Sequence, residues 1–323
     1  MNSSDIKKLI GPIAIFGSGG FIGSHLLHQV GKERSDVIGF SHNPKEAWRL
    51  KHLKIPQRNI ATCDLLEKEA VFKSLKKYKP KTIFNLAAYG AYSWEKNVTR
   101  IYDVNLTSTA NLIEILKETG FAAYIQAGSQ SEYGLNAAGP AENDELIPNS
   151  HYAVSKTAVY HLMKYYGKIE KLPVVHMRLY SVYGPLEEKG RLIPTLIDSI
   201  RQGTLPPFVD RRISRDFVYV DDVVAAFITI ASKISAKHFG EAYNVASGKK
   251  TTMANLAVLS KKIFNIKAVP HFGTMKKRDW DVVNWYGNPA KIKKAFNWKP
   301  TTSLSEGLIK CYRYGQSTKN QNH

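Results

Sequence analysis

Cysteine, acidic residues and long hydrophobic runs are all scarce in this sequence of 323 residues. The two cysteines, Cys63 and Cys311, exclude a disulfide framework and a cysteine-based zinc site, and they favour a reducing compartment. No apolar run approaches the about 18 residues that a membrane-spanning helix needs. The longest, residues 223–231, indicates a buried helix. We therefore expect a cytoplasmic protein that does not span a membrane.

The shortage of acidic residues gives the chain a strong positive charge. Asp and Glu number 27 against 46 Lys and Arg, so the formal net charge is +19 and the pI is near 9.7. This excess favours an anionic partner: nucleic acid, an acidic membrane or a phosphorylated small molecule. A basic stripe interleaved with aromatic residues is typical of nucleic-acid binding, whereas the lysines here are scattered. A non-catalytic nucleic-acid-binding or regulatory protein is therefore the less favoured alternative.

Short apolar runs alternate with longer amphipathic segments over the first 180 residues. Strand candidates lie at residues 12–16, 36–40, 82–86, 122–127 and 173–179, and helical patterns at residues 21–30, 69–78 and 104–118. This alternation predicts a parallel sheet covered by helices on both faces. After residue 185 the loops lengthen, and a further helix is predicted at residues 220–232.

A glycine-rich turn joins the first predicted strand to the first predicted helix. Its spacing is Gly17-x-x-Gly20-x-x-Gly23, with Phe21 and Ile22 opening the helix. In a dinucleotide site the first glycine permits the tight turn, the second lets backbone approach a pyrophosphate, and the third lets helix and strand pack closely. The helix N-terminus adds amide donors and the positive end of the helix dipole. The turn therefore predicts dinucleotide binding.

The end of the second predicted strand bears on which dinucleotide is bound. NAD sites usually carry an acid there for the ribose hydroxyls, but residues 41–43 are neutral. A 2′-phosphate suits hydroxyl and basic groups, which are supplied here by Ser41, Lys45 and Arg49. We expect NADP, with NAD held by neutral donors as the alternative. Asp64 is expected either to accept from the adenine amino group or to cap a helix from Leu65 onward.

Tyr152 and Lys156 lie four residues apart at the start of an amphipathic segment. This spacing puts both on one helix face, where the ammonium can lower the phenol pKa from about 10 and bind a ribose. Tyr152 would then donate or accept a proton near neutral pH. Ser129 ends the fifth predicted strand, where active-site residues of α/β proteins gather. We expect these three residues to form the catalytic set.

Together with these features, six ordered segments resemble the extended short-chain dehydrogenase/reductase family of nucleotide-sugar epimerases, dehydratases and reductases. They are Asn85-Leu86-Ala87-Ala88, Asn105-Leu106-Thr107-Ser108-Thr109, Gly128-Ser129-Gln130-Ser131-Glu132-Tyr133-Gly134, Arg178-Leu179-Tyr180-Ser181-Val182-Tyr183-Gly184-Pro185, Arg215-Asp216-Phe217-Val218-Tyr219-Val220-Asp221-Asp222-Val223 and Tyr243-Asn244-Val245-Ala246-Ser247-Gly248. The resemblance covers about residues 13–307. It is specific to the family and much less specific to one reaction.

The resemblance implies an α/β fold, with a Rossmann-type doubly wound parallel sheet and a smaller α/β C-terminal substrate lobe. Residues 1–180 and 217–246 would form the NAD(P)-binding domain, residues 181–216 and 247–315 the lobe, and residues 316–323 a tail. A homodimer is implied through the helices at residues 104–118 and 152–169. No metal site is expected.

The resemblance also assigns residues to the two ligands. Cofactor contacts would come from Gly17, Gly20, Phe21, Ile22, Gly23, Ser41, Lys45, Arg49, Asp64, Leu65, Leu86, Ala87, Ala88, Asn105, Tyr152 and Lys156. Contacts with a nucleotide-sugar substrate would come from Tyr89, Ser131, Ser181, Arg191, Arg215 and Arg278. The two last-named arginines would bind its diphosphate, and Tyr89 has ordinary packing as its alternative.

Departures from the family pattern narrow the expected reaction. Family dehydratases carry a Glu that removes the C5 proton soon after the catalytic Ser, but here Gln130 and Ser131 follow Ser129, and Glu132 comes one position too late. A dehydratase or decarboxylase is therefore the disfavoured alternative. Ser181 replaces an Asn that is common in sugar epimerases. We expect action at C4 of a nucleotide-diphosphate sugar in glycan precursor synthesis, by a 4-ketosugar reductase (slightly favoured with NADP) or a 4-epimerase.

Overall fold

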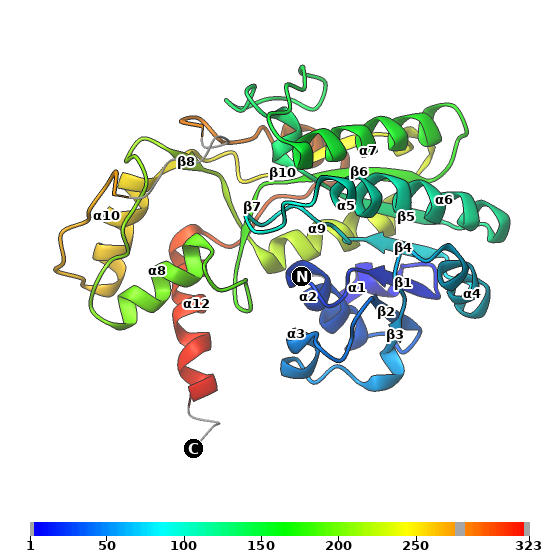
Figure 1. The fold of residues 1–323 in the computed structure, drawn as a ribbon, viewed down its shortest axis with the longest axis horizontal. Helices are drawn as coiled ribbons and strands as arrows, with labels where there is room; N and C mark the ends of the chain where they lie inside the picture. Colours follow the sequence, from blue (N-terminus) through cyan, green and yellow to red (C-terminus); the bar gives the residue numbers. More distant parts are fainter. Residues whose placement is uncertain (1–2, 275–281, 320–323) are drawn as a thin grey trace.

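The computed structural model describes residues 3–274 and 282–319. A parallel sheet with helices on both faces forms the larger part of the molecule, and a smaller lobe lies beside it, at the left in Figure 1. Within the described residues, none of the helices combines the length and apolar character needed to cross a membrane.

Seven strands form the main sheet, and every neighbouring pair is parallel. They are β1 (Ile13–Phe16), β2 (Val37–Ser41), β3 (Ile60–Thr62), β4 (Thr82–Asn85), β5 (Ala123–Ser129), β6 (Val174–Leu179) and β10 (Ala242–Val245). Their order is β10-β6-β5-β4-β1-β2-β3, so the strand order reverses at β1. The predicted Rossmann-type doubly wound sheet is confirmed. Ligands of such sheets bind outside the carboxyl ends of the strands at this reversal.

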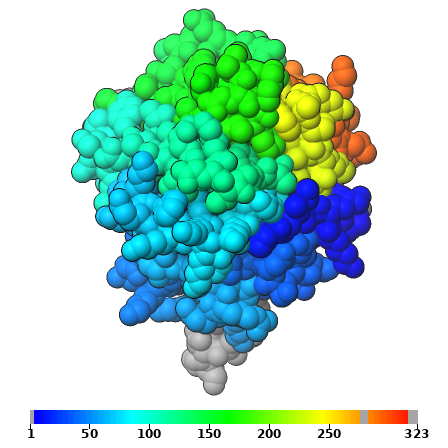
Figure 2. Space-filling model, turned by 90° about the vertical axis from the view of Figure 1, so that its right-hand side faces the viewer, coloured from blue at the N-terminus to red at the C-terminus, as the bar shows by residue number. Residues whose placement is uncertain are grey.

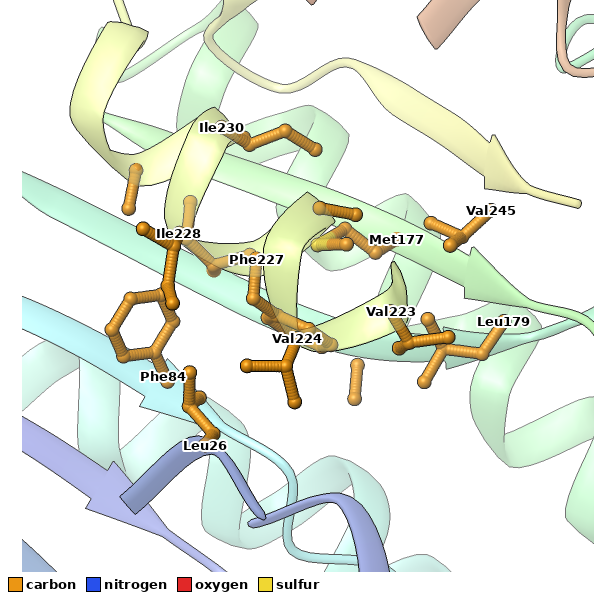
Figure 3. Close-up of a cluster of buried hydrophobic side chains, with 14 of the residues drawn as sticks. Leu26, Phe84, Met177, Leu179, Val223, Val224, Phe227, Ile228, Ile230 and Val245 are labelled. Atoms are coloured by element: carbon orange, nitrogen blue, oxygen red, sulfur yellow. The ribbon is translucent and has the colours of Figure 1, made fainter. Parts of the chain in front are cut away.

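Two hydrophobic cores hold the helices on the sheet. One face is covered by α4 (Lys68–Tyr78), α6 (Ser108–Thr119) and α7 (His151–Lys168). The other is covered by α1 (Ser3–Lys7), α2 (Phe21–Gly31), α9 (Val220–Lys233) and α11 (Ala290–Phe296). In the second core, Val223, Val224 and Phe227 of α9 pack over the strands beside Phe84 and Leu26 (Figure 3). The apolar face of α9 therefore explains why residues 223–231 are so hydrophobic.

The helix predicted at residues 104–118 begins with a π-helical turn, η2 (Asp103–Thr107), and continues as α6. A further short helix, α5 (Val98–Tyr102), directly precedes the predicted range. The π turn contains Asn105, whose side chain reaches out of the helix to the backbone of Tyr89. Single π turns within helices are frequent at functional sites, and apolar periodicity alone does not reveal them.

The smaller lobe has its own hydrophobic core and two short two-stranded sheets. Its elements are β7 (Ser181–Tyr183), α8 (Leu192–Arg201), β8 (Ser214–Arg215), β9 (Phe217–Tyr219), β11 (Thr251–Thr252), α10 (Met253–Phe264) and α12 (Leu304–Lys319). Asp216 ties its segments together, because this buried carboxylate accepts hydrogen bonds from the backbone of Ser247, Gly248 and Gly287.

Two observations bear on the expected division of the chain. Helix α11 packs on the large sheet, with Ile292 and Phe296 in the same core as α9, although it falls in a range assigned to the lobe. Figure 2, which views the right-hand side of Figure 1, shows α11 (orange) beside the segment around η4 (Ala236–His238, yellow), and His238 lies 4.5 Å from Phe296 between ring centroids. Helix α12 also continues to Lys319, into the range expected to be a tail. The domain boundaries themselves stay a prediction.

Candidate active site

The glycine turn lies between β1 and α2, at the reversal of strand order. Gly17 has φ +76°, and a Cβ there would lie 2.6 Å from the backbone nitrogen of Ala87. A Cβ at Gly23 would lie 2.2 Å from the carbonyl oxygen of Gly17. Gly20 is the N-cap of α2, and no side chain caps that end. A turn without room for side chains, opening onto an uncapped helix N-terminus, fits the pyrophosphate of a dinucleotide.

The residues expected to meet a 2′-phosphate lie in different surroundings. Ser41 is buried at the end of β2, and Lys45 is exposed. Arg49, in α3 (Trp48–His52), is only 6% exposed: its Nε donates to the carbonyl oxygen of Leu186 at 2.8 Å, and its Nη2 to Glu188 Oε2 at 2.7 Å. The guanidinium is therefore already paired, contrary to the expectation of a cation free for the cofactor. Its partners lie 137 and 139 positions further along the chain, beyond the reach of a local sequence pattern.

Asp64 and Leu65 lie just beyond β3. Asp64 Oδ1 accepts a hydrogen bond from the backbone of Leu66 at 3.0 Å, so the carboxylate caps the turn there, and α4 begins only at Lys68. Leu65 is buried in the core beneath α4 and α6. A contact of either residue with adenine stays a prediction.

Residues 86–89 continue from β4 along the carboxyl edge of the sheet. Asn85 Oδ1 accepts from the backbone of Ala87 at 3.2 Å. Asn105 bonds both backbone groups of Tyr89 and donates to Ser155 Oγ at 2.8 Å. Since Ser155 lies between the two catalytic candidates on α7, Asn105 ties this loop to the catalytic helix. Leu86 is half-buried and Ala88 is exposed.

The three catalytic candidates come together at the carboxyl end of β5. Ser129 ends that strand, and Ser150 caps α7 by accepting from the backbone of Ala153, which starts the helix just before Tyr152. Ser129 interacts with the Tyr152 side chain, and this interaction acts to lower the pKa of the phenol. Lys156 Nζ lies 5.8 Å from the centroid of the Tyr152 ring and donates to the carbonyl oxygen of Ala127 at 3.0 Å. The structure therefore brings the predicted set into one cluster.

The electrostatics of this cluster differ from the expectation. Burial raises the pKa of Tyr152 to about 12, although the Ser129 hydrogen bond acts in the opposite direction. Burial also lowers the pKa of Lys156 to about 8, opposed by the charge of Glu132. The expected lowering of the phenol pKa by Lys156 is thus absent in the protein alone. The reason is that both groups are shielded from water, which disfavours the charged form of each.

Glu132 is fully buried in the interior. Its carboxylate lies 2.8 Å from His176 Nε2 and 2.7 Å from Arg178 Nε, and it accepts from the backbone of Ser129 at 2.7 Å. A Cβ at residue 128 would lie 2.5 Å from this carboxylate, which explains the glycine there. Burial alone would raise the pKa of Glu132, but the charges of His176 and Arg178 lower it to about 2. A carboxylate so fully paired is a structural anion rather than a general base.

Ser129 is followed by η3 (Gln130–Tyr133). Its first two residues, Gln130 and Ser131, have no carboxylate. Gln130 Nε2 donates to Ser181 Oγ at 3.3 Å, which links η3 to β7. Ser131 is half-buried, and its backbone nitrogen donates to Ser129 Oγ at 3.1 Å. These polar, non-basic side chains border the candidate catalytic Ser129.

The candidate substrate residues lie on elements of both the large sheet and the smaller lobe. Arg191 is the N-cap residue of α8; it pairs with Glu187 at 3.5 Å and lies over the ring of Tyr92 at 5.7 Å. Arg215 lies over the ring of Trp285 at 4.5 Å. The guanidinium of Arg100 lies 5.4 Å from the ring of Tyr89. Arg278, the second arginine expected at the diphosphate, lies outside the described residues.

Two carboxylates of this region, Glu95 and Glu188, were not predicted from the sequence. Glu95 accepts from the backbone of Gly90 and Tyr92, and so orders the loop that packs against Tyr152. An acid that bonds amides in a glycine-containing turn is a recognisable local signal. Glu188, the partner of Arg49, carries no such signal, because its partner is distant in the sequence.

Comparison with known proteins agrees with this geometry. Residues 13–246 match the profile of the NAD-dependent epimerase/dehydratase family. The chain is 29% identical to the uncharacterized UDP-glucose epimerase YtcB of Bacillus subtilis (strain 168), over 92% of this chain and 95% of that protein. It is 28% identical to a UDP-glucuronate 4-epimerase of Thermodesulfobacterium geofontis (strain OPF15), over 93% and 94%.

A solved structure leads to the same assignment. The crystal structure of a UDP-glucuronic acid 4-epimerase from Bacillus cereus, in complex with UDP-glucuronic acid and NAD, is similar with a TM-score of 0.82 at 27% identity, over 95% of this chain and 99% of that one. Since the family profile spans most of the chain and includes the glycine turn and all three catalytic candidates, this protein belongs to the NAD-dependent epimerase/dehydratase family and is an enzyme.

Proposed function

We propose that the protein is an NAD-dependent 4-epimerase of a UDP-linked hexose or hexuronate. The observation that carries the proposal is the cluster of Ser129, Tyr152 and Lys156 beside the glycine turn, next to a glutamate that is buried in ion pairs. This combination suits proton and hydride exchange at a carbinol carbon and lacks the base needed for C5 deprotonation. The similar proteins named above are 4-epimerases or a UDP-glucose epimerase by description.

Tyr152 is the proposed general base and acid of the reaction. It removes the proton of the C4 hydroxyl and returns it after the sugar has turned over, while Ser129 holds the same oxygen. A bound nicotinamide dinucleotide supplies the hydride acceptor at C4 and then the donor to the opposite face. Because burial raises the pKa of Tyr152 to about 12, the enzyme needs additional positive charge nearby to ionise this phenol at neutral pH. Lys156 is the protein's own cation in reach.

NAD is the cofactor we propose, in place of the earlier preference for NADP. The expectation of NADP used Arg49 together with Ser41 and Lys45, and of these three the Arg49 guanidinium is paired with Glu188. The crystal structure of the Bacillus cereus 4-epimerase named above holds NAD, which supports this choice. The glycine turn, Asp64, Leu65, residues 86–88 and Asn105 remain the proposed contacts, and Tyr89, Ser131, Ser181, Arg191 and Arg215 remain the proposed substrate side chains.

The test is to incubate purified protein with UDP-glucose and with UDP-glucuronate, without added cofactor, and to follow the sugar by NMR. We expect conversion to the C4 epimer of at least one of them, with NAD identified in the protein by native mass spectrometry. Tyr152→Phe is the matched control and should give no epimer. Stoichiometric consumption of added NADPH with a 4-ketosugar, and no epimer from either UDP-sugar, would contradict the proposal.

We also propose a homodimer that forms through α5, α6 and α7. Three large apolar or aromatic side chains on α5 and α7 are exposed: Val98 at 41%, Val154 at 39% and Tyr165 at 49%. Burial of such side chains favours association. Sedimentation velocity should give twice the mass of the chain, and Val154→Glu should give a monomer. A monomeric wild-type protein at micromolar concentration would contradict this proposal.

A further inference from the structure

The segment at residues 184–188, which follows β7, crosses from the start of α2 to α3. Its contacts proceed in order along the segment. A Cβ at Gly184 would lie 3.6 Å from the Phe21 ring, the Pro185 carbonyl accepts from His25 Nε2 at 2.9 Å, and Leu186 and Glu188 both bind Arg49. The segment therefore approaches the glycine turn at its start, through Phe21, and then runs along α2 to α3.

Arg49 is the anchor of this crossing. Its guanidinium makes one hydrogen bond to a carbonyl and one to a carboxylate, stacks over Trp48 at 4.5 Å, and is buried. Charge-assisted bonds of a guanidinium shielded from water are among the stronger hydrogen bonds of proteins, and breaking one leaves a buried charge without its partner. Opening the segment away from α3 therefore carries a substantial energetic cost.

The region of α3 also contacts both the glycine turn and the smaller lobe. A Cβ at Gly19, in the glycine turn, would lie 3.0 Å from the Ala47 side chain that precedes α3. On the other side, His52 Nε2 lies 2.7 Å from the Tyr314 hydroxyl of α12. The short helix thus joins the turn expected to hold the pyrophosphate to the smaller lobe.

We propose that residues 184–188 and α3 form a clasp, closed by the Arg49–Glu188 pair, that retains the dinucleotide through successive turnovers. The proposal rests on the proposed function, because a 4-epimerase returns its cofactor to the starting oxidation state and gains nothing by releasing it. Arg49 and Glu188 act here as positioning residues. Their pair keeps residues 184–188 against α3, beside the turn expected to bind the pyrophosphate, and neither residue exchanges a proton or hydride with the substrate.

The experiment measures release of NAD from the holoenzyme, by rapid dilution into a dehydrogenase that traps free NAD. Glu188→Gln keeps the size of the side chain and removes the charge that binds Arg49, so we expect release to be about tenfold faster than in the wild type. The double variant Glu188→Gln with Arg49→Gln should release NAD at a rate similar to that of Glu188→Gln alone, because both changes break the same interaction.

Asp36→Asn is the matched control. It removes the carboxylate of another arginine pair of the same domain, Arg34–Asp36, also at 2.7 Å, which lies at the opposite end of β2. We expect its NAD release rate to equal that of the wild type, while thermal unfolding without cofactor is compared across all variants. A general loss of stability would accelerate release in both variants, whereas the clasp predicts acceleration in Glu188→Gln alone.

A release rate for Glu188→Gln within twofold of the wild type would overturn the clasp and leave the proposed epimerase intact. Epimerisation that is absent, with NAD bound and its release accelerated by Glu188→Gln, would contradict the proposed reaction and support the clasp. A purified protein that binds neither NAD nor NADP in the same assay would overturn both.

Discussion

Two polar clusters meet at the end of β5, and they differ in how their charges are satisfied. In the first, Glu132 pairs with His176 and Arg178, and all three side chains are fully buried. In the second, the buried Lys156 donates to the neutral carbonyl of Ala127, and Tyr152 interacts with the hydroxyl of Ser129. They are joined where Glu132 accepts from the backbone of Ser129.

The difference separates a structural cluster from a reactive one. Pairing moves the pKa of Glu132 down to about 2 and raises the pKa of Arg178 further, so neither group changes charge near neutral pH. Burial without an opposite charge moves the pKa of Lys156 down to about 8, toward the working range. Ionisable groups with perturbed pKa values beside a cleft are the stronger candidates for catalysis.

The largest expected effect is on the reactive cluster. Tyr152→Phe removes the proposed proton donor and acceptor, and we expect turnover to fall by about 10³–10⁴-fold, or about 4–5.5 kcal/mol of transition-state stabilisation. The free energy of unfolding should stay within about 0.5–1 kcal/mol of the wild type, because the phenol oxygen has a single hydroxyl partner. Steady-state kinetics and urea unfolding of the same preparation measure both. Turnover above a tenth of the wild-type rate would remove Tyr152 from the mechanism.

The opposite result is expected in the structural cluster. Glu132→Ala leaves Arg178 buried without its carboxylate, and the loss of one partner of a buried ion pair costs about 3–5 kcal/mol of stability. Urea unfolding measures this loss. If Glu132 were instead the catalytic base, the variant would keep its stability and lose turnover, and the distinction between the two clusters would fail.

The dependence of stability on acidic pH tests the role of Glu132 in the structural cluster. The folded pKa of Glu132 is about 2, below the ordinary value of 4.5, so its contribution to stability is complete above pH 4.5 and is lost as the pH falls from 4.5 toward 2. The stability difference between the wild type and Glu132→Gln should therefore be constant at neutral pH and shrink below pH 4.5. Unfolding curves from pH 7 to pH 3 measure it, and a difference that is independent of pH would contradict the pairing.

The smallest expected change in the free energy of unfolding concerns Lys156. Since burial disfavours its charged form, Lys156→Met should leave the free energy of unfolding unchanged or raise it by about 1 kcal/mol, while turnover falls sharply. Thermal unfolding of the cofactor-free protein measures this. Destabilisation as large as that of Glu132→Ala would mean that Lys156 is a structural cation as well.

Much of the fold and the core of the site could be predicted because their signals are local. The alternation of apolar runs predicts the strands and helices of the parallel sheet. The glycine turn is recognisable because its three glycines lie within seven residues. Tyr152 and Lys156 share a helix face by spacing alone. Ser129 could be added because the carboxyl ends of parallel strands meet at one edge.

Local sequence patterns were thus sufficient to predict the Rossmann-type sheet, the glycine turn and three catalytic candidates. The electrostatic partners of these residues could not be predicted in this way, because groups distant in the chain are brought together only by folding. Gln130 and Ser131 already indicated the lack of a dehydratase base, but only the structure pairs Glu132 with His176 and Arg178, 44 and 46 positions away. From the sequence we expected Arg49 to bind a phosphate, whereas the fold pairs it with Glu188. Burial, which sets the pKa values of Tyr152 and Lys156, is likewise a property of the packed molecule.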